Sequence, residues 1–426
     1  MTMTQPIRTS VPGPTGVRRL FAARAADVRS HLEVFGPMPA AFDIGHLLAE
    51  LDDSGLAGRG GAGFPTWRKL MAAAQANGLI AGVGRERTPG RRAVVIANGA
   101  EGEPLSRKDE TLLRCAPHLV LDGLLLAADT IGARDVVLYS TAGTLEGVAR
   151  AVADRQDASR VRLVTASDTF LSGEASAVVN AVGGGPALPR DHVQRLTQRG
   201  LGGAPTLVQN VETLAHLALL ARFGASWFRS QGSPDDPGTR LVSVSGDLPA
   251  PRVLELPGGA PLSDALTASG AAPDSLRAVL VGGYHGAWVP ADRLDVPLSP
   301  GSLAPFGAAP GAGVLMALGA HRCGLEASAE ITTYLAGQSA RQCGPCANGL
   351  PRLAEVLHRL AAKERVSWLP REIERLAGIV TGRGSCHHPD GTSRLVLSAL
   401  TVFESDVAAH LAGRCEARPV ASGRAR

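Results

Sequence analysis

The chain has few aromatic residues and no long hydrophobic run. Aromatics make up 4% of its 426 residues. No uninterrupted apolar run reaches the ~18 residues that a membrane-spanning helix needs, so no membrane span is predicted. Residues 1–16, MTMTQPIRTSVPGPTG, contain no apolar core of the kind found in secretory signals. We therefore expect a cytoplasmic protein that reaches a membrane only peripherally, through partners.

The chain also lacks a strong excess of either charge. Lys and Arg together number 43 and Asp and Glu 39. No long basic run and no platform of basic and aromatic residues is present, so the sequence does not predict nucleic-acid binding. A hydrophobic fraction of 45% is sufficient for a sizeable buried core.

Glycine, in contrast, is abundant, and its densest cluster lies in GRGGAGFPTWRK, from Gly58 to Lys69. Positions without a Cβ let the backbone adopt positive φ and bring its N–H groups against a ligand. Lys69 adds a cation at the rim, and Trp67 to Ala74 can continue as a helix whose N-terminus faces an anion. The segment therefore predicts a cradle for a phosphate or a flat ring. The alternative interpretation is an ordinary tight loop.

Apolar runs and helical periodicity alternate after this loop, which predicts a layered α/β core. The usual dinucleotide-binding fingerprint is missing, because GAGFP does not follow an apolar strand. The predicted strands are Ala93–Ala97, Asp135–Tyr139 and Arg160–Ala166, and the predicted helices between them are Pro117–Ile131 and Gly143–Arg155.

Three polar turns each open a helix, which leaves backbone donors free at those positions. If the turns converge, they form one ligand site together with the glycine loop. The alternatives are helix capping and solvated surface turns, the latter for Glu103 and Asp109 in particular. The residues concerned are Asn98, Glu101, Glu103 and Asp109 in the first turn, Gly173 and Glu174 in the second, and Asn210, Glu212 and Thr213 in the third.

The rest of the chain changes character twice. Residues 1–40 are expected to form a loose arm before the α/β domain at 41–238. Short β-rich runs around one helix predict a small α+β module within 239–324. Helical periodicity then predicts a bundle over 325–412, with helices at 325–336, 347–362, 370–380 and 395–411, followed by a tail at 413–426.

Six cysteines in a reducing compartment are expected to be thiols or metal ligands. Cys343 and Cys346 form a CxxC, and Cys386 lies in a later loop of the bundle. Such a trio can hold zinc, with His387 or His388 as a fourth ligand, or an iron–sulfur cluster, which prefers a fourth cysteine. The alternative is burial as small apolar groups. Cys115 and Cys415 have no partner at metal-ligand spacing.

Taken in order, these segments resemble the NADH-binding flavoprotein subunit of respiratory complex I. Its relatives include subunits of soluble hydrogenases and the C subunit of the Rnf electron-transfer complex. The similarity runs from about residue 55 to 405 and is carried by GRGGAGFPT, NGAEGEPLSRKD, SGEASA, GGAPTLVQNVET and CGPC. The resemblance implies a Rossmann-like FMN-binding domain, a ubiquitin-like SLBB module and a helical bundle with a 4Fe–4S cluster. It also implies electron flow from NADH through FMN and the cluster to an iron–sulfur partner protein.

The resemblance further assigns residues to each cofactor. It implies that Phe64 and Glu103 help to hold the nicotinamide nucleotide and that Cys343, Cys346 and Cys386 hold the cluster. The residues implied for FMN are Gly58, Gly60, Gly61, Lys69, Asn98, Glu101, Gly173, Glu174, Asn210 and Thr213.

Several positions depart from the family pattern. Ala340 stands where the first cluster cysteine belongs. The alternatives are Cys323 or His387 as the replacement ligand, or a cluster that is labile, three-iron or absent. Ala175 and Ala100 replace acidic residues near the nucleotide, and His192 and Arg195 stand at positions where the family has basic and aromatic residues. The pattern therefore favours FMN binding more strongly than NADH oxidation. The alternatives are a non-catalytic or ferredoxin-linked interaction subunit, or structural zinc in the bundle.

Overall fold

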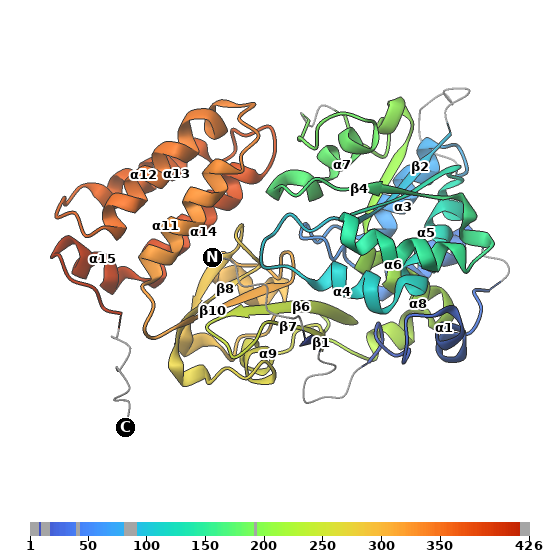
Figure 1. The fold of residues 1–426 in the computed structure, drawn as a ribbon, viewed down its shortest axis with the longest axis horizontal. Coiled ribbons are helices and arrows are strands. Elements are labelled where there is room, and N and C mark those ends of the chain that lie inside the picture. The colour runs from blue at the N-terminus through green and yellow to red at the C-terminus, as the bar shows by residue number, and fades with distance from the viewer. Residues whose placement is uncertain (1–7, 10–17, 40–42, 81–91, 191–193, 418–426) are drawn as a thin grey trace.

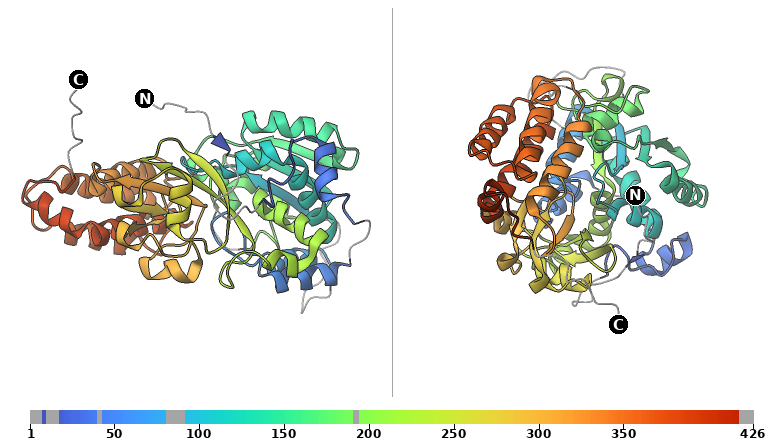
Figure 2. Two further views of the ribbon diagram at one scale, coloured as in Figure 1. Left: turned by 90° about the horizontal axis from the view of Figure 1, so that it is seen from below. Right: turned by 60° about the vertical axis from the view of Figure 1, so that its left-hand side comes forward.

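The computed structural model describes residues 8–9, 18–39, 43–80, 92–190 and 194–417. Three parts follow one another along the long axis of the molecule (Figures 1 and 2). An α/β part lies at one end, a mostly antiparallel sheet lies in the middle, and a helical bundle lies at the other end. The order in space follows the order along the sequence, except that β1 Arg8–Thr9 joins the middle sheet.

The α/β part is built on a four-stranded parallel sheet with strand order β4-β3-β2-β5. Alternate residues of a strand face opposite sides. Val95 and Ala97 of β2 accordingly pack with α3, α5, α6 and α8, whereas Val94 and Ile96 pack with α7. The strands are β2 Val94–Gly99, β3 Asp135–Ser140, β4 Val161–Thr165 and β5 Thr206–Asn210, and the helices are α3 Thr66–Ala76, α4 Lys108–Cys115, α5 Pro117–Ile131, α6 Ala142–Ala153, α7 Ala175–Val182 and α8 Val211–Arg229.

Local sequence signals account well for the elements of this part. The predicted helix Pro117–Ile131 is observed at those bounds as α5, with Pro117 in its first turn and Gly132 in the left-handed conformation at its end.

Among the described residues, no single helix is long and apolar enough to cross a membrane. Helices α4 and α5 meet those criteria only as a pair, and the pair is bent by 98°.

The described part of the N-terminal segment, residues 8–9 and 18–39, is not the loose arm expected from its proline and arginine content. Leu20 and Phe21 are buried in the α/β core. The buried carboxylate of Glu255 accepts hydrogen bonds from the backbone N–H groups of Arg19 and Leu20, although Arg19 and Glu255 are 236 residues apart. This long-range anchor has no local sequence signature. The segment contains β1 Arg8–Thr9 and α1 Val28–Phe35, and α2 Ile44–Ser54 follows.

The middle part is a six-stranded sheet with order β1-β7-β6-β10-β8-β9. Strands β6 and β7 form one antiparallel pair, and β8 and β9 form another. Strand β10 lies between them, parallel to β6 and antiparallel to β8. The strands are β6 Thr239–Gly246, β7 Arg252–Pro257, β8 Leu276–Val281, β9 Ala287–Pro290 and β10 Val314–Gly319, with α9 Leu262–Ala268 and α10 Pro300–Leu303 between them.

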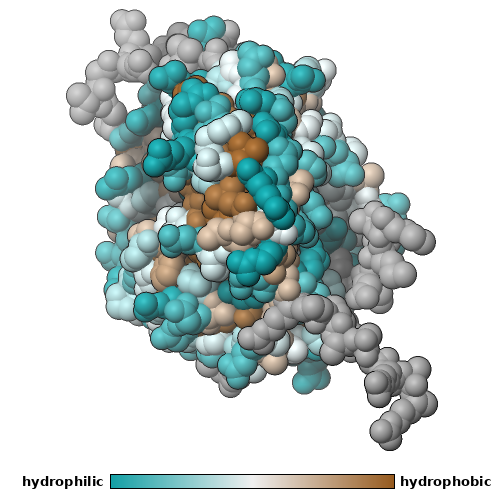
Figure 3. Space-filling model, turned by 90° about the vertical axis from the view of Figure 1, so that its left-hand side faces the viewer, coloured by the Kyte–Doolittle hydropathy of each residue, from teal (hydrophilic) through white to brown (hydrophobic). Residues whose placement is uncertain are grey.

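The bundle packs against this sheet, because Leu280 of β8 and Leu318 of β10 share one hydrophobic cluster with the bundle helices. Seen from the bundle end, the surface has an apolar area bordered by hydrophilic residues (Figure 3). The predicted helix at 395–411 is divided by Phe403 into two. The helices are α11 Gly324–Gly337, α12 Leu350–Ala361, α13 Leu369–Val380, α14 His388–Val402 and α15 Glu404–Leu411.

Candidate functional site

A cleft of about 810 Å³ lies where the three parts meet. The glycine loop and the three polar turns of the α/β part converge on it, as the sequence predicted. The middle sheet contributes Gly282 and His285, and the bundle contributes Cys386 and His387. The predicted residues that line the cleft are Gly60, Gly61, Asn98, Glu101, Glu103, Gly173, Glu174 and Asn210.

The glycine loop lies against the carboxyl end of β5. A Cβ atom at Gly60 would lie 3.1 Å from Cβ of Asn210, the last residue of that strand. Gly61 has φ +116° and Gly63 has φ +60°, conformations that residues with a Cβ rarely adopt. The carboxyl end of a parallel sheet is the usual location of ligand sites in α/β proteins.

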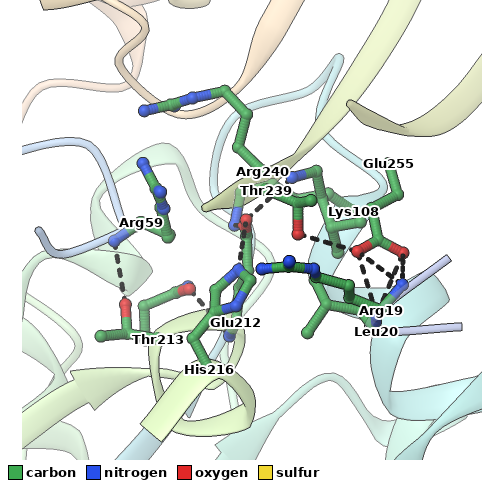
Figure 4. A network of polar contacts seen from close by, with 12 residues as sticks. Arg19, Leu20, Arg59, Lys108, Glu212, Thr213, His216, Thr239, Arg240 and Glu255 are labelled. Carbon is green, nitrogen blue, oxygen red and sulfur yellow. Dashed lines mark hydrogen bonds and ion pairs between the residues drawn. The ribbon is translucent and has the colours of Figure 1, made fainter. Parts of the chain in front are cut away.

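The loop is anchored from behind by buried polar contacts (Figure 4). The backbone N–H of Arg59 donates a 2.9 Å hydrogen bond to Oγ1 of Thr213 in the first turn of α8. The Arg59 guanidinium pairs with Asp236 at 2.6 Å, just before the middle sheet begins. Thr213 therefore positions the loop and does not line the cleft.

Two asparagines connect the polar turns to one another. Asn98 donates a 2.9 Å hydrogen bond to the carbonyl of Gly173. Asn210 donates to Asp109 at 2.6 Å, and its side-chain oxygen accepts the N–H of Glu212 at 3.0 Å, which caps α8. The capping interpretation of Asn210 is therefore correct, and the same residue also lines the cleft.

Two glutamates of the cleft are also helix caps. The Glu174 carboxylate accepts the N–H groups of Ser176 and Ala177 at 2.9 Å, at the start of α7. Glu101 accepts the N–H groups of Asp109 and Glu110 at 3.1 and 3.0 Å, at the start of α4. A carboxylate at a helix N-terminus is stabilised by the free amide donors there.

A buried charge cluster that has no distinctive sequence pattern also borders the cleft, through Lys108 and Asp109. Lys108 pairs with Asp109 at 2.6 Å and with Glu212 at 2.9 Å, and it is 2% exposed. Burial lowers the pKa of Lys108, but the charges of Asp109, Glu212 and Glu101 outweigh it, so its pKa is raised. Burial raises the pKa of Asp109 to about 7. The alternative interpretation of Asp109 as a surface charge is wrong, because its side chain is buried.

Glu103 connects the α/β part to the middle sheet. Its Oε2 atom accepts the backbone N–H of Tyr284 at 2.7 Å, in the turn between β8 and β9. Burial raises the pKa of Glu103 to about 7, against the hydrogen bonds from Tyr284 and Leu105, which lower it. The carboxyl is thus poised to exchange a proton near neutral pH. The surface interpretation of Glu103 does not hold.

The other predicted cofactor residues, Gly58, Phe64, Lys69 and Thr213, are not among the described residues that line the cleft. The Phe64 side chain is 51% exposed. Lys69 donates a 2.5 Å hydrogen bond to the Val208 carbonyl in β5, and burial lowers its pKa to about 8. Lys69 therefore holds α3 against the sheet beneath the glycine loop.

The three predicted cluster cysteines are near neighbours beside the cleft. The pKa of Cys346 is raised to about 12, first by burial and then by a hydrogen bond to Cys343 and by the charges of Cys343 and Cys386. Cys386 itself lines the cleft. The backbone of Arg341, which has φ +55°, donates to the Cys346 thiol. The CxxC turn and the loop before α14 therefore bring three thiols close to one another, and one of them, Cys386, lines the cleft.

The candidates for a fourth ligand differ in their surroundings. His388 has Nδ1 3.0 Å from His285 and Nε2 2.8 Å from the Leu335 carbonyl, so both of its nitrogens are engaged. His387 has a side chain that is 90% exposed and lies 3.3 Å from Asp390. Cys323 precedes α11 and Cys343 follows it, and a helix of 14 residues is about 21 Å long. Cys323 is therefore at the wrong end of α11 to join the trio.

Two parts of the chain match models of known protein families. Residues 51–219 match the family model described as the Nuo51 FMN-binding domain. Residues 326–410 match the NADH-ubiquinone oxidoreductase-F iron–sulfur binding region. Both models describe parts of one kind of flavoprotein subunit, so the chain is similar to that subunit in two separate regions. The first match contains the glycine loop and the three polar turns, and the second contains all three cysteines of the trio.

Several members of the family are similar over most of the chain. An NADH-quinone oxidoreductase F subunit of Rhizobium meliloti (strain 1021) is 28% identical over 85% of this chain and 88% of its own length. The corresponding F subunit of Streptomyces coelicolor is 28% identical over 86% and 83%. A solved NAD+-reducing [NiFe]-hydrogenase in the H2-reduced state has a TM-score of 0.76 and 29% identity, and the match covers 88% of this chain and 63% of that chain. The air-oxidized form gives a TM-score of 0.81 at 28% identity, covering 95% and 68%.

The chain thus carries an FMN-binding domain and a 4Fe–4S binding region. The residues that depart from the family pattern lie in or near these two sites. Ala100 lines the cleft, and Ala175 is the first residue of α7. Ala340 precedes the CxxC turn. His192 lies outside the described residues.

Proposed function

We propose that this protein oxidises NADH at an FMN held in the cleft and passes the electrons through an iron–sulfur cluster in the bundle to an iron–sulfur partner protein. The observation that carries this proposal is the position of Cys386, which belongs to the cysteine trio and lines the same cleft as the glycine loop. Two redox groups held by these residues would be neighbours. The names of the related F subunits and of the NAD+-reducing hydrogenase support the choice of NADH.

The residues present fit FMN. The cleft volume falls within the range of about 300 to 1,000 Å³ that is typical of ligand pockets. Gly60 and Gly61 leave room where a Cβ would intrude, so backbone N–H groups can approach a phosphate. FMN, when bound, accepts two electrons together and releases them one at a time.

The helix caps distinguish the glycine loop, whose backbone donors can bind the phosphate, from the polar turns, whose donors are already bonded. Glu101, Glu174 and Asn210 already occupy first-turn donors of α4, α7 and α8. The glycine loop is then the principal source of free backbone donors for the phosphate, and the capped turns face the ring and the ribityl chain. Lys69 and Thr213 support the loop from behind. Glu103, with its pKa near 7, would lie beside the nicotinamide nucleotide.

In the bundle, Cys343, Cys346 and Cys386 would supply three thiolates to the cluster. Ala340 leaves the fourth position without a cysteine in register, and both nitrogens of His388 are engaged. We therefore propose a cluster held by three cysteines, with the exposed His387 or a ligand from solution at the fourth iron. Such a cluster is expected to lose iron more readily than one with four thiolates.

We also propose that 239–324 is the ubiquitin-like SLBB module of the family. Two antiparallel hairpins on either side of the central strand β10, with α9 and α10 between the strands, support this assignment. The FMN domain would then be 41–238 with the described part of the N-terminal segment attached, and the cluster domain 325–412. The iron–sulfur partner would dock near the bundle, which keeps the protein at most peripheral to a membrane in the cytoplasm.

Ala100, Ala175 and Ala340 favour a second candidate, a ferredoxin-linked or non-catalytic interaction subunit. Anaerobic purification followed by assays of flavin, iron and labile sulfide separates the two. The leading proposal requires flavin and iron in the same chain, and NADH-dependent reduction of an artificial acceptor after reconstitution. Both cofactors without NADH turnover would favour the ferredoxin-linked subunit, and zinc in place of iron would favour a structural site.

A further inference from the structure

A second group of ligand-type side chains lies at the end of α11 that is opposite the cysteine trio. Cys323, Asp406, His410 and Cys415 each offer one ligand atom, and these atoms all lie within 4.8 Å of one another. Cys323 precedes α11, Asp406 and His410 belong to α15, and Cys415 follows α15. Both cysteines fall outside residues 326–410, so the match to the iron–sulfur region does not account for this group.

His410 is held in the tautomer that a metal ligand needs. Its Nδ1 atom lies 3.0 Å from the carbonyl oxygen of Leu360, which can only accept, so Nδ1 carries the proton. The lone pair of Nε2 then points to the Sγ atom of Cys323, 3.4 Å away. Metal-binding histidines usually donate their other ring N–H to a carbonyl or a carboxylate.

Asp406 supplies an independent indication of a missing cation. The residue is fully buried, and its Oδ2 atom pairs with Arg277 of β8 at 2.5 Å. Its Oδ1 atom has no hydrogen-bond partner among the described residues. An unsatisfied buried acceptor costs about 1 to 3 kcal/mol or more. A cation between Asp406 and His410 would satisfy this oxygen, and Arg277 would hold the other one.

The turn after α15 places Cys415 beside the other three residues. Gly413 has φ +77°, and its N–H donates to the His410 carbonyl at 2.8 Å. The N–H of Arg414 donates to the Ala409 carbonyl at 2.8 Å. This pair of bonds is a Schellman motif, which reverses the chain at a helix end. The reversal brings the Cys415 thiol back over α15.

We propose that Cys323, Asp406, His410 and Cys415 bind one zinc ion, which fastens the end of α15 to the start of α11. Two sulfurs, one imidazole nitrogen and one carboxylate oxygen form a ligand set that zinc favours. With Zn–S near 2.3 Å and Zn–N near 2.0 Å, tetrahedral ligand atoms lie about 3.5 to 3.8 Å apart. The four ligand atoms here all lie within 4.8 Å of one another, and Cys323 Sγ lies 3.4 Å from His410 Nε2. A four-iron cluster distributes its ligands over separate irons, which suits this compact group less well.

The site is balanced in protons and charge. Burial, followed by the neighbouring Cys415, raises the pKa of the Cys323 thiol to about 12. Zinc binding breaks two S–H bonds, forms two Zn–S bonds and releases two protons to solvent. Two thiolates, one carboxylate and Zn²⁺ leave a single negative charge, which Arg277 offsets.

Zinc analysis of the full-length protein tests this site independently of flavin or NADH. Wild-type protein incubated with Zn²⁺ and desalted should retain about one zinc per chain. Cys323→Ser and Cys415→Ser should each lose most of it, whereas the matched control Cys115→Ser, in α4, should retain it. Zinc retention that is absent in the wild type, or unchanged in both variants, would overturn the proposal.

Thiol protection in the wild type provides a measurement that does not depend on the folding of a variant. Cys323 and Cys415 should resist iodoacetamide while zinc is bound and react after a chelator is added, as read by peptide mass spectrometry. Reactivity that is indifferent to the chelator would contradict the site. A Cys323–Cys415 disulfide recovered from protein kept under reducing conditions would also contradict it.

Discussion

Glu103 Oε2 accepts the backbone N–H of Tyr284 at 2.7 Å, so one carboxyl group joins the α/β part to the turn between β8 and β9. The two residues are distant in sequence, and both parts contribute to the cleft. Because burial raises the pKa of this carboxyl to about 7, the contact combines a structural link with a group that titrates near neutral pH.

The raised pKa predicts a pH dependence of stability. The folded protein holds the Glu103 proton more tightly than the unfolded chain does. The contribution of this group to the free energy of unfolding should therefore fall as pH rises from 4.5 to about 7, and stay constant above that. Glu103→Gln should remove this fall. Between pH 5 and about 7, the melting temperature of the wild type should fall relative to that of the variant as the pH rises. From about pH 7 to 8, the difference between the two melting temperatures should stay constant.

Glu146→Gln is the matched control, because Glu146 is exposed on α6. Its melting curves should run parallel to those of the wild type. A Glu103→Gln variant that also runs parallel would show that the carboxyl does not titrate in this window.

Thr213→Val tests the anchoring of the glycine loop. The substitution preserves shape but removes the acceptor of the Arg59 N–H in a buried site. We expect a loss of about 1 to 3 kcal/mol in the free energy of unfolding, measured in urea, and weaker FMN binding. Thr213→Ser keeps the hydroxyl and should bind FMN like the wild type. Equal FMN affinity in all three proteins would contradict the anchoring role.

Gly60→Ala tests the cradle itself. The new methyl group would lie 3.1 Å from Cβ of Asn210, which cannot move freely because Asp109 and Glu212 hold its amide. We expect the FMN dissociation constant to rise about 10-fold or more, equivalent to about 1.4 kcal/mol, by fluorescence titration of deflavinated protein. Gly147→Ala on α6, where a Cβ meets no atom within 4 Å, should not change it. An unchanged constant in Gly60→Ala would place the flavin elsewhere.

Ala340→Cys should repair the cluster site. A fourth thiolate is expected to raise the iron content toward about four per chain and to slow cluster loss in air. Gly337→Cys, at the end of α11, is the matched control, because a Cβ atom there meets no atom within 4 Å. Iron and labile sulfide are measured over time after exposure to air. Equal decay in wild type and Ala340→Cys would contradict a vacant cysteine position at 340.

Much of the site could be predicted because its signals are local. Pro117 and Gly132 mark the two ends of α5 in the sequence itself. The glycine loop and the polar turns follow the carboxyl ends of strands or precede helices, and parallel strands bring such ends to one edge. The resemblance then supplied the ligand that this edge would hold.

The rest depends on contacts between distant residues. Glu255 accepts hydrogen bonds from backbone amides of the N-terminal segment, and His285 of the middle sheet lines the cleft. Cys323 and His410 are neighbours although 87 residues separate them, so ligand spacing along the sequence does not reveal them. Lys108 was visible in the sequence, but only its burial beside Asp109 gives it a role in the site.

The central claim is that NADH reduces a flavin in this chain, and anaerobic titration of the purified flavoprotein with NADH tests it directly. The proposed function predicts that flavin absorbance bleaches as NADH is added, with an end point of about one NADH per flavin and about half an NADH more for each cluster that accepts one electron. A flavin that dithionite bleaches but NADH leaves unchanged would contradict it.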